Sequence, residues 1–423
     1  MGKKNILVFP CGSEIGLEIH RSLVNSTFFN LIGANSVEDH GKFQFETYIG
    51  GLPFYNDASF LPTLKKIIKE YKIDAIYPAM DSVIEYFKKN EKDLGCLVIA
   101  PEYQTTQICL SKSKTYNFLE GYIKTPKVYK KSDKLSFPVF VKPDVGYGSR
   151  GAKKITSSME LESHLALGQE FIISEFLPGN EYTIDCFTDK NRQLQAVKPR
   201  ARGRISNGIS VNTKPIKLTS EISEIASVIN KKLKLRGAWF FQVKENKLGQ
   251  LVLLEIACRF GGSSALYRAK GINFAQLTLF DAFGYDVGII ENGYSVEMDR
   301  ALNNRYKLDL KYDEVFVDFD DCIYLEKSKI NTQLIAFLYE CLNQSIKVSL
   351  ITKHDGDLQM KLAELRIENV FDRVIHIKRQ DEKHNYIDNL NSIFIDDSFA
   401  ERKAIKDKCK IPVFSVDMVE VLM

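Results

Sequence analysis

The sequence predicts a multidomain protein of the α/β and α+β classes, and three observations carry this prediction. Its 423 residues are too many for a single domain with one hydrophobic core, because a domain usually holds about 100 to 200 residues. Short apolar runs alternate with helical patterns over residues 1–105, and a similar alternation begins again near residue 312. Between them, the strand-like runs carry more charge and have glycine-rich joints. We therefore predict three domains, over residues 1–105, 106–300 and 312–423.

The composition is that of an ordinary globular protein, with 44% apolar and 26% charged residues. A net charge of +4 is small for this length, so we expect no nucleic-acid partner. The 8 cysteines form no C-x-x-C pair, which is typical of reduced thiols in the cytosol. The first apolar run is too short for a signal peptide, and no apolar stretch reaches the ~18 residues of a membrane span. We expect a cytoplasmic protein without a membrane partner.

Residues 1–105 are predicted to form a parallel sheet covered by helices. The runs NILVFP, FNLIGAN, DAIYPA and CLVIAP are apolar on both faces, as buried parallel strands are. Phe60, Leu64, Ile67 and Ile68 fall on one helical face. The turn PCGSEIG lacks G-x-G-x-x-G, so a plain tight turn is favoured over a dinucleotide site. The architecture expected for this domain is Rossmann-like.

The stretch FPVFVKPDVGYGSRGAKKI places Lys142 at the end of an apolar strand, before a loop with three glycines, Gly146, Gly148 and Gly151. Such a loop lets backbone N–H groups approach phosphate oxygens, and a neighbouring lysine adds a positive charge for the same oxygens. A hairpin with a solvated lysine explains the pattern equally well, and the spacing is not that of the G-x-x-x-x-G-K-[ST] loop.

A second basic feature lies in AVKPRARGRIS, where four cationic residues alternate along the chain. If the segment is an extended strand, their side chains emerge on one face. The four are Lys198, Arg200, Arg202 and Arg204. They could form a solvated basic edge, or they could bind an anionic co-substrate or its acyl phosphate.

The stretch LLEIACRFGGSSALYRAKG (253–271), read with GAWFFQVKEN, FIISEFLPGNEYTIDCF and the glycine loop, resembles the ATP-grasp family over roughly residues 106–300. The resemblance is to its carbamoyl-phosphate-synthetase-like branch, and residues 1–105 would be the family's preceding domain. It implies ATP as co-substrate and Mg²⁺ (or Mn²⁺) held by Gln242 and Glu255, with Arg259 catalytic near the transferred phosphoryl group. The implied ATP contacts are Lys114, Lys142, Ser149, Arg150, Glu175, Phe176, Leu177 and Glu181, and the implied substrate contacts are Arg200, Arg202 and Arg204.

The sequence departs from that family at one metal position. The family pattern is E-x-N-x-R, whereas this chain has Ala257 two residues after Glu255. Residues two apart on a strand share a face, and a methyl group cannot coordinate a cation. The metal is then held more loosely by ATP and water, or catalysis has been lost.

The stretch EVFVDFDDCIY (314–324) is an apolar strand that ends in the carboxylates Asp318, Asp320 and Asp321. Crowded carboxylates repel one another unless a cation or a phosphoryl group lies between them. Downstream strands end in Thr352 and in the pair Asp396–Asp397. A solvated turn is the alternative for D-x-D alone.

This series resembles the haloacid-dehalogenase-like (HAD-like) phosphatases over residues 312–423, a doubly wound α/β domain. The resemblance implies that Asp318 attacks a phosphoryl group, Asp320 moves the proton, and Thr352 and Lys383 bind phosphoryl oxygens. Mg²⁺ would be held by Asp318 with Asp397 or Asp396. Lys378 is the alternative third-motif lysine, and Cys322 replaces a common Thr or Val. The ~30 residues between the first two motifs leave no room for a cap domain.

Together these resemblances predict a two-part enzyme. Its front part would join a small-molecule carboxylate to an amine through an acyl phosphate, and its back part would be a Mg²⁺-dependent phosphatase. Alternatively, the front part only binds nucleotide, as a sensor or scaffold, or both parts are inactive assembly modules. A homodimer is expected from related enzymes.

Overall fold

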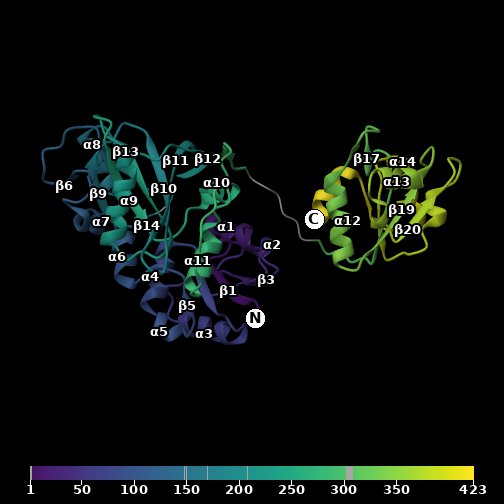
Figure 1. The fold of residues 1–423 in the computed structure, drawn as a ribbon, viewed down its shortest axis with the longest axis horizontal. Coiled ribbons are helices and arrows are strands. Elements are labelled where there is room, and N and C mark those ends of the chain that lie inside the picture. Colours follow the sequence, from purple (N-terminus) through teal and green to yellow (C-terminus); the bar gives the residue numbers. More distant parts are fainter. Residues whose placement is uncertain (1, 147, 149, 169, 207, 302–307) are drawn as a thin grey trace. The chain divides into compact units, whose positions relative to one another are not determined.

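The computed structural model describes residues 2–146, 148, 150–168, 170–206, 208–301 and 308–423. The chain divides into two compact units, Met1–Leu302 and Asn303–Met423, each with its own sheets and core (Figure 1). The predicted mixed α/β multidomain class is confirmed. Within the described residues, no helix combines the length and apolar character needed to cross a bilayer.

The first unit begins with a sheet of five parallel strands in the order β3-β2-β1-β4-β5. Its strands are β1 (Lys4–Phe9), β2 (Phe29–Ala34), β3 (Thr47–Ile49), β4 (Ala75–Pro78) and β5 (Leu97–Val98). The helices of this part are α1 (Glu14–Leu23), α2 (Gly41–Gln44), α3 (Phe60–Glu70), α4 (Asp81–Lys89), α5 (Glu91–Leu94), α6 (Tyr103–Leu110) and α7 (Lys112–Leu119). The apolar face predicted for α3 is buried in the core, which confirms the predicted parallel sheet with helical cover.

Two antiparallel sheets follow in the same unit. The smaller has the order β6-β9-β7-β8, and the larger has the order β14-β13-β10-β11-β12-β15. The small sheet holds β6 (Val128–Tyr129), β7 (Val139–Pro143), β8 (Lys153–Ile155) and β9 (Phe171–Glu175), and α8 (Ser158–Leu165) joins β8 to β9. The large sheet holds β10 (Glu181–Thr188), β11 (Leu194–Ser206), β12 (Ile209–Pro215), β13 (Gly237–Glu245), β14 (Leu251–Ala257) and β15 (Met298–Asp299). The predicted division of this unit at residues 105 and 106 remains a prediction.

One face of the large sheet packs against α9 (Ser220–Lys232), which Thr219 caps through a bond from the Ile222 amide to its hydroxyl. Trp239 and Phe241 alternate on β13 and are buried with the apolar face of that helix. The alternate residues Phe240 and Gln242 therefore lie on the opposite face of the sheet, and both line a cavity there. The remaining helices of the unit are η1 (Gly262–Ser264), α10 (Ala265–Ala269) and α11 (Phe274–Ala282).

The second unit is built on five parallel strands in the order β20-β19-β16-β21-β22. Its strands are β16 (Glu314–Val317), β17 (Tyr324–Leu325), β18 (Lys329–Ile330), β19 (Lys347–Thr352), β20 (Arg373–His376), β21 (Ser392–Ile395) and β22 (Val413–Phe414), of which β17 and β18 form a separate hairpin. Its helices are α12 (Thr332–Asn343), α13 (Leu358–Glu364), η2 (Glu368–Val370), η3 (Lys383–Tyr386), α14 (Phe399–Cys409) and η4 (Val416–Leu422). Because the pairings are parallel, the carboxyl ends of β16, β19 and β21 meet at one edge.

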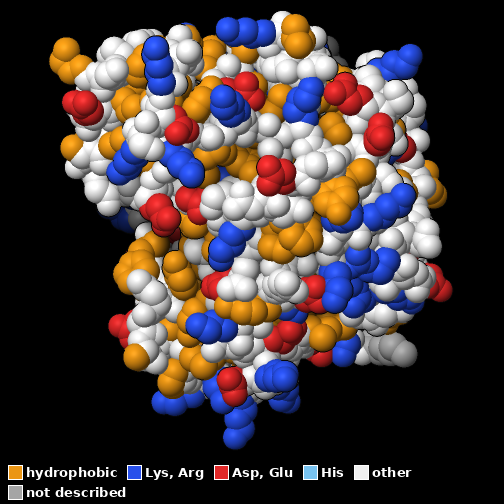
Figure 2. Space-filling view, turned by 90° about the vertical axis from the view of Figure 1, so that its left-hand side faces the viewer, with side chains coloured by type: hydrophobic (Ala, Val, Ile, Leu, Met, Phe, Trp, Pro, Cys, Tyr) orange, Lys and Arg blue, Asp and Glu red, His pale blue; other side chains and the backbone are white. Residues whose placement is uncertain are grey.

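One face of the protein carries mixed charge. On the face that Figure 2 shows, Lys and Arg side chains are interspersed with Asp and Glu side chains. This distribution fits the small net charge of +4.

Candidate functional site

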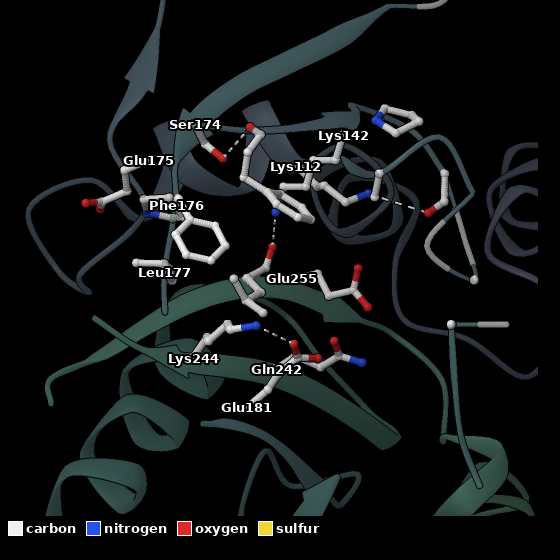
Figure 3. A pocket seen from close by; sticks show the side chains of 18 of the residues that line it. Lys112, Lys142, Ser174, Glu175, Phe176, Leu177, Glu181, Gln242, Lys244 and Glu255 are labelled. Atoms are coloured by element: carbon white, nitrogen blue, oxygen red, sulfur yellow. Dashed lines mark hydrogen bonds and ion pairs between the residues drawn. The ribbon is translucent and has the colours of Figure 1, made fainter. Parts of the chain in front are cut away.

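A cavity of about 160 Å³ in the first unit is lined by residues of both antiparallel sheets. Lys142 comes from β7, Ser174 from β9, Glu181 from β10, Gln242 from β13 and Glu255 from β14. Figure 3 shows the two lysines Lys112 and Lys142 on one side of this pocket and the side chains of the large sheet on the other. The predicted ATP-site residues Lys142, Arg150, Glu175, Phe176, Leu177 and Glu181 all line it. We call it the front pocket.

Lys142 is a buried cation in the front pocket, with only 7% of its surface exposed. Its Nζ donates to the hydroxyl of Tyr116 at 2.7 Å and to the Leu254 carbonyl at 3.4 Å. Burial lowers the pKa of Lys142 to about 8, although the nearby Glu255 carboxylate acts in the opposite direction. A buried ammonium without a full counter-charge is a favourable partner for an anionic ligand.

Lys112, rather than the predicted Lys114, is the second lysine of the pocket. Lys112 is buried, and its Nζ donates to the carbonyls of Asp144 at 3.3 Å and Gly146 at 3.5 Å. Lys114 is exposed and is absent from the described lining. Residues two apart on a helix point about 200° apart, so only one of them faces the pocket. Ser149, also predicted to bind ATP, lies outside the described residues.

The predicted adenine edge lines the end of the pocket at the turn after β9. Phe176 and Leu177 line it together with Phe140 and Leu254, which gives an apolar surface for a flat base. The Glu175 carboxylate accepts a bond from the Lys127 amide at 3.1 Å, so its side chain is held at the strand end. This geometry suits stacking and edge hydrogen bonding of a purine.

Gln242 and Glu255 are opposite each other on β13 and β14, and both line the pocket. Two neighbouring oxygen donors facing two buried lysines suit a hard divalent cation that also contacts phosphate oxygens. Ala257 pairs with Phe240 and is buried, so no ligand atom takes the place of the missing family residue there. The residues present therefore fit Mg²⁺ with a reduced protein ligand set.

A larger cavity of about 890 Å³ adjoins the front pocket, and Gln242, Glu255, Arg150 and Arg202 line both. We call it the arginine cavity. Ser13, in the loop that follows β1, and Asp81, the first residue of α4 after β4, contribute to it. Ligands commonly bind at the carboxyl ends of parallel strands, which explains why these segments reach the site.

The predicted Arg200 and Arg259 both line the arginine cavity and are held by ion pairs, of which that of Arg200 is buried and that of Arg259 is partly buried. Arg200 Nε lies 2.7 Å from Asp185, and Arg259 Nη2 lies 2.6 Å from Asp81. Burial opposes the charge of Arg259, but Asp81 outweighs it and raises the pKa of the guanidinium. Among the described residues, Arg200 Nη1 and Arg259 Nε have no hydrogen-bond partner, so both retain donors for a ligand.

The expectation that all four cations of β11 share one face is wrong at Arg204. Its side chain is 61% exposed and pairs with Asp299 at 2.9 Å, outside the lining of both cavities. The pairing with β12 shifts register between Arg202 and Arg204, at Gly203. A β-bulge breaks the alternation of side chains, which explains the difference. Lys198 also pairs elsewhere, with Glu291 at 2.6 Å.

In the second unit, Asp318, Lys383 and Asp396 form a buried ion-pair cluster. Lys383 Nζ lies 2.8 Å from Asp318 Oδ1 and 2.6 Å from Asp396 Oδ2. Burial raises the pKa of Asp396 to about 6, against the attraction of Lys383. Burial likewise raises the pKa of Asp318, which Lys383 and the Thr352 hydroxyl oppose. The structure thus places Lys383, and not Lys378, beside Asp318.

A second group shares Asp318. One ligand atom from each of Asp318, Cys322 and Asp397 lies within 4.8 Å of the other two. Asp397 is exposed, whereas Asp396 is fully buried and paired with Lys383. Asp397 is therefore the better placed of the two candidate metal ligands. Two carboxylates fit Mg²⁺, and the thiol of Cys322 is a less suitable ligand for it.

Asp320 stands apart from this cluster, with its side chain 42% exposed. Nδ1 of His354 lies 2.9 Å and 3.0 Å from its two carboxylate oxygens. The sequence analysis did not single out His354, because nothing in the order of residues links positions 320 and 354. It also missed Lys112, Ser13 and Asp81, although Ser13 lies in the recognised turn PCGSEIG.

Comparisons with known proteins agree with the fold of the first unit. Residues 168–304 match a family model described as ATP-grasp in the biosynthetic pathway with Ter operon. A D-alanine–D-alanine ligase from Clostridium botulinum (strain Alaska E43 / Type E3) is 30% identical over 118 residues, or 25% of this chain. The chain spans only 39% of the length of that relative.

Two solved structures are similar at low sequence identity. N5-carboxyaminoimidazole synthetase from Staphylococcus aureus, complexed with ADP, has a TM-score of 0.59 at 17% identity, over 71% of this chain and 83% of that chain. The biotin carboxylase domain of Hydrogenobacter thermophilus 2-oxoglutarate carboxylase has a TM-score of 0.57 at 14% identity, over 69% of this chain and 72% of that chain. The unit Met1–Leu302 therefore has an ATP-grasp fold, and residues 168–304 of the chain match an ATP-grasp family model.

Proposed function

We propose that the first unit is an ATP-dependent ligase that activates a carboxylate as an acyl phosphate and joins it to an amine. The main observation behind this proposal is that two cavities share a wall, which Gln242 and Glu255 form. Gln242 and Glu255 border both the front pocket, with its buried lysines, and the arginine cavity, with its buried guanidinium groups. A phosphoryl group at this wall could pass from a nucleotide in one cavity to an acceptor in the other.

In this proposal, ATP lies in the front pocket with its base against Phe176 and Leu177 and its phosphates near Lys112 and Lys142. Mg²⁺, held by Gln242 and Glu255, would neutralise phosphate charge when bound. A carboxylate oxygen of the substrate attacks the γ-phosphorus, the bond to the β–γ bridging oxygen breaks, and ADP leaves. The amine nitrogen then attacks the acyl carbon, the bond from that carbon to the phosphate oxygen breaks, and inorganic phosphate leaves. The proton that the nitrogen loses passes to the phosphate or to water.

The arginines of the second cavity would bind and orient the carboxylate and then stabilise the acyl phosphate. Arg200 and Arg259 are fixed by Asp185 and Asp81, and Arg200 Nη1 and Arg259 Nε have no hydrogen-bond partner among the described residues. Fixed donors stabilise developing charge more than mobile ones do, because they need no reorganisation during the reaction.

The similar proteins support the same proposal. The relative from Clostridium botulinum is named for a ligase reaction, and both similar structures were solved with ADP. The Hydrogenobacter thermophilus domain also held magnesium, in a structure described as a dimer. The predicted homodimer and cytoplasmic location remain predictions for this chain.

The test is ADP release from the full chain with ATP, Mg²⁺ and a panel of carboxylates, each with and without amines. We expect release that depends on one carboxylate, and a loss of about 100-fold or more in Glu255→Gln. Arg204→Gln is the matched control, because that side chain lies outside both cavities. Tight ATP binding without turnover for any pair would overturn the ligase and favour the nucleotide-sensor alternative, to which Ala257 points.

We also propose that the second unit is a HAD-like, Mg²⁺-dependent phosphatase. Asp318 would attack phosphorus, Asp320 would give its proton to the leaving oxygen, and water would then hydrolyse the aspartyl phosphate. Lys383 and Thr352 would hold phosphoryl oxygens, and Mg²⁺ at Asp318 and Asp397 would neutralise their charge. The support is the geometry of the cluster, in which Lys383 lies 2.8 Å from Asp318.

The phosphatase is tested by hydrolysis of p-nitrophenyl phosphate by the full chain with and without Mg²⁺. Asp318→Asn should abolish hydrolysis, because the amide is a poor nucleophile. Asp321→Asn is the control, since that neighbouring carboxylate is exposed and has no assigned role. Activity that survives in Asp318→Asn would contradict the mechanism.

A further inference from the structure

A basic pocket lies at the carboxyl ends of β19 and β20 in the second unit. Its volume is about 400 Å³. It is lined by Lys353, His354, Asp355, His376, Ile377, Lys378 and Arg379. Thr352 and His376 pair in register at the ends of the two parallel strands, so the loops that follow them leave the sheet together. None of these lining residues belongs to the Asp318–Lys383–Asp396 cluster.

The lining carries three permanent cations and one carboxylate. Arg379 is paired with Asp355, and Lys353 is paired at 2.6 Å with Glu401. For Lys378, no ion pair with any described residue is present, and its side chain is exposed. The pocket therefore has an excess positive charge, carried mainly by Lys378 and available to an anion from solution.

His354 connects the basic pocket to the proposed reaction. Its Nδ1 contacts the Asp320 carboxylate, and its ring meets Phe319 edge-on with centroids 5.1 Å apart. The carbonyl of His354 contacts Nε2 of His376 at 2.7 Å, so one residue touches Asp320 while its neighbours line the pocket. Asp320 is the group proposed to protonate the leaving oxygen. The pocket therefore lies on the leaving-group side of the reaction.

We propose that this pocket binds a second anionic group on the alcohol part of the phosphatase substrate. The inference rests on the proposed phosphatase function and extends it to a substrate class. The substrate would be a phosphomonoester whose leaving group carries a carboxylate or another phosphate. A phosphatase without a cap domain, as the spacing of the motifs predicts, would need such a subsite for selectivity, because the phosphoryl group itself is common to all phosphomonoesters. Lys378 supplies the main charge, and His354 is a positioning residue for Asp320.

The experiment compares two substrates that differ only in this group, 3-phosphoglycerate and glycerol 3-phosphate, with the full chain and Mg²⁺. We expect kcat/KM to favour 3-phosphoglycerate by about tenfold, a typical effect of one well-placed charge pair. Lys378→Gln should reduce the preference to less than about threefold. Lys408→Gln, which makes the same charge change at an exposed position of α14, should keep it.

The outcomes separate the subsite from the phosphatase. Hydrolysis of both substrates at equal rates would overturn the subsite and leave the phosphatase standing. Hydrolysis of neither, nor of p-nitrophenyl phosphate, would end the phosphatase proposal and the substrate class with it. In that case, calorimetry with 3-phosphoglycerate that still depends on Lys378 would identify an anion site unconnected with hydrolysis. An unchanged preference in Lys378→Gln would also contradict the inference.

Discussion

Replacing Lys383 by methionine should destabilise the second unit strongly. The lysine is 3% exposed and lies within 2.8 Å of two carboxylates, Asp318 and Asp396, that are themselves buried. Methionine keeps most of the volume but leaves two buried carboxylates facing each other. Removing one partner of a buried ion pair costs about 3–5 kcal/mol, mainly because the remaining charge is uncompensated. We therefore expect Lys383→Met to lower the unfolding free energy of the second unit by about 3–5 kcal/mol at pH 8.

The same loss should be smaller at pH 5. Burial already raises the pKa of Asp396 to about 6 from an ordinary 3.8, and without Lys383 it would rise further. A carboxyl whose pKa is higher in the folded state takes up protons on folding, so its folded state gains stability as pH falls. The neutral acid costs far less to bury than the carboxylate.

The assay is hydrogen exchange of the full chain, followed by mass spectrometry, over the strand peptides of residues 314–317 and 392–395. Fluorescence of Trp239, the only tryptophan, reports the first unit separately and should not change between variants. The double variant Lys383→Met, Asp396→Asn should be more stable than Lys383→Met by at least about 1 kcal/mol in unfolding free energy at pH 8, because it has one uncompensated buried charge fewer. Equal losses at pH 5 and pH 8, with no recovery in the double variant, would refute the electrostatic explanation.

Three further outcomes are expected. Raising the pH from 7 to 9 should weaken ATP binding, by up to about tenfold for each pH unit above 8. The reason is that Lys142 has a pKa of about 8 and must be charged to hold phosphate. Calorimetry measures the affinity, and Lys142→Met, which has no lysine to titrate there, should not show this pH dependence. Arg200→Met should lower the free energy of unfolding by about 3–5 kcal/mol, because it leaves the buried Asp185 carboxylate without its partner. Arg204→Met, at an exposed position, should lower it by less than about 1 kcal/mol. Urea unfolding followed by Trp239 fluorescence measures both. Glu255→Gln should leave the free energy of unfolding within about 0.5 kcal/mol of the parent while ADP release falls, since the side chain is only partly buried.

The sequence predicts much of the second unit's site because strand ends carry it. Asp318, Thr352 and Asp396 all follow apolar runs, and parallel strands bring such ends to one edge. The partner of Asp320 was not predictable, because His354 lies on a loop whose direction depends on tertiary packing. The choice between Asp396 and Asp397 needed the burial of each, which adjacent positions on a chain do not reveal.

In the first unit, the resemblance to ATP-grasp proteins predicted Gln242 and Glu255, whereas strand periodicity failed at Arg204. Alternation assumes an unbroken ladder, and the bulge at Gly203 shifts it by one residue. The two lysines of SKSK are equally plausible from their local sequence, and only the packing of α7 turns Lys112 inward. The contribution of Asp81 could not be foreseen, because it comes from a helix start 178 positions before its partner Arg259.

The wall formed by Gln242 and Glu255 has a thermodynamic consequence (Figure 3). A ligand bound in one cavity changes the electrostatic field at this wall and the mobility of its side chains. A second ligand, bound in the other cavity, contacts the same wall. Such an effect is reciprocal, so any factor by which adenine nucleotide sharpens acceptor affinity must equal the factor by which acceptor sharpens nucleotide affinity. Equilibrium affinities therefore cannot favour binding of one ligand before the other. An observed binding order would reflect the rates at which the ligands enter the two cavities.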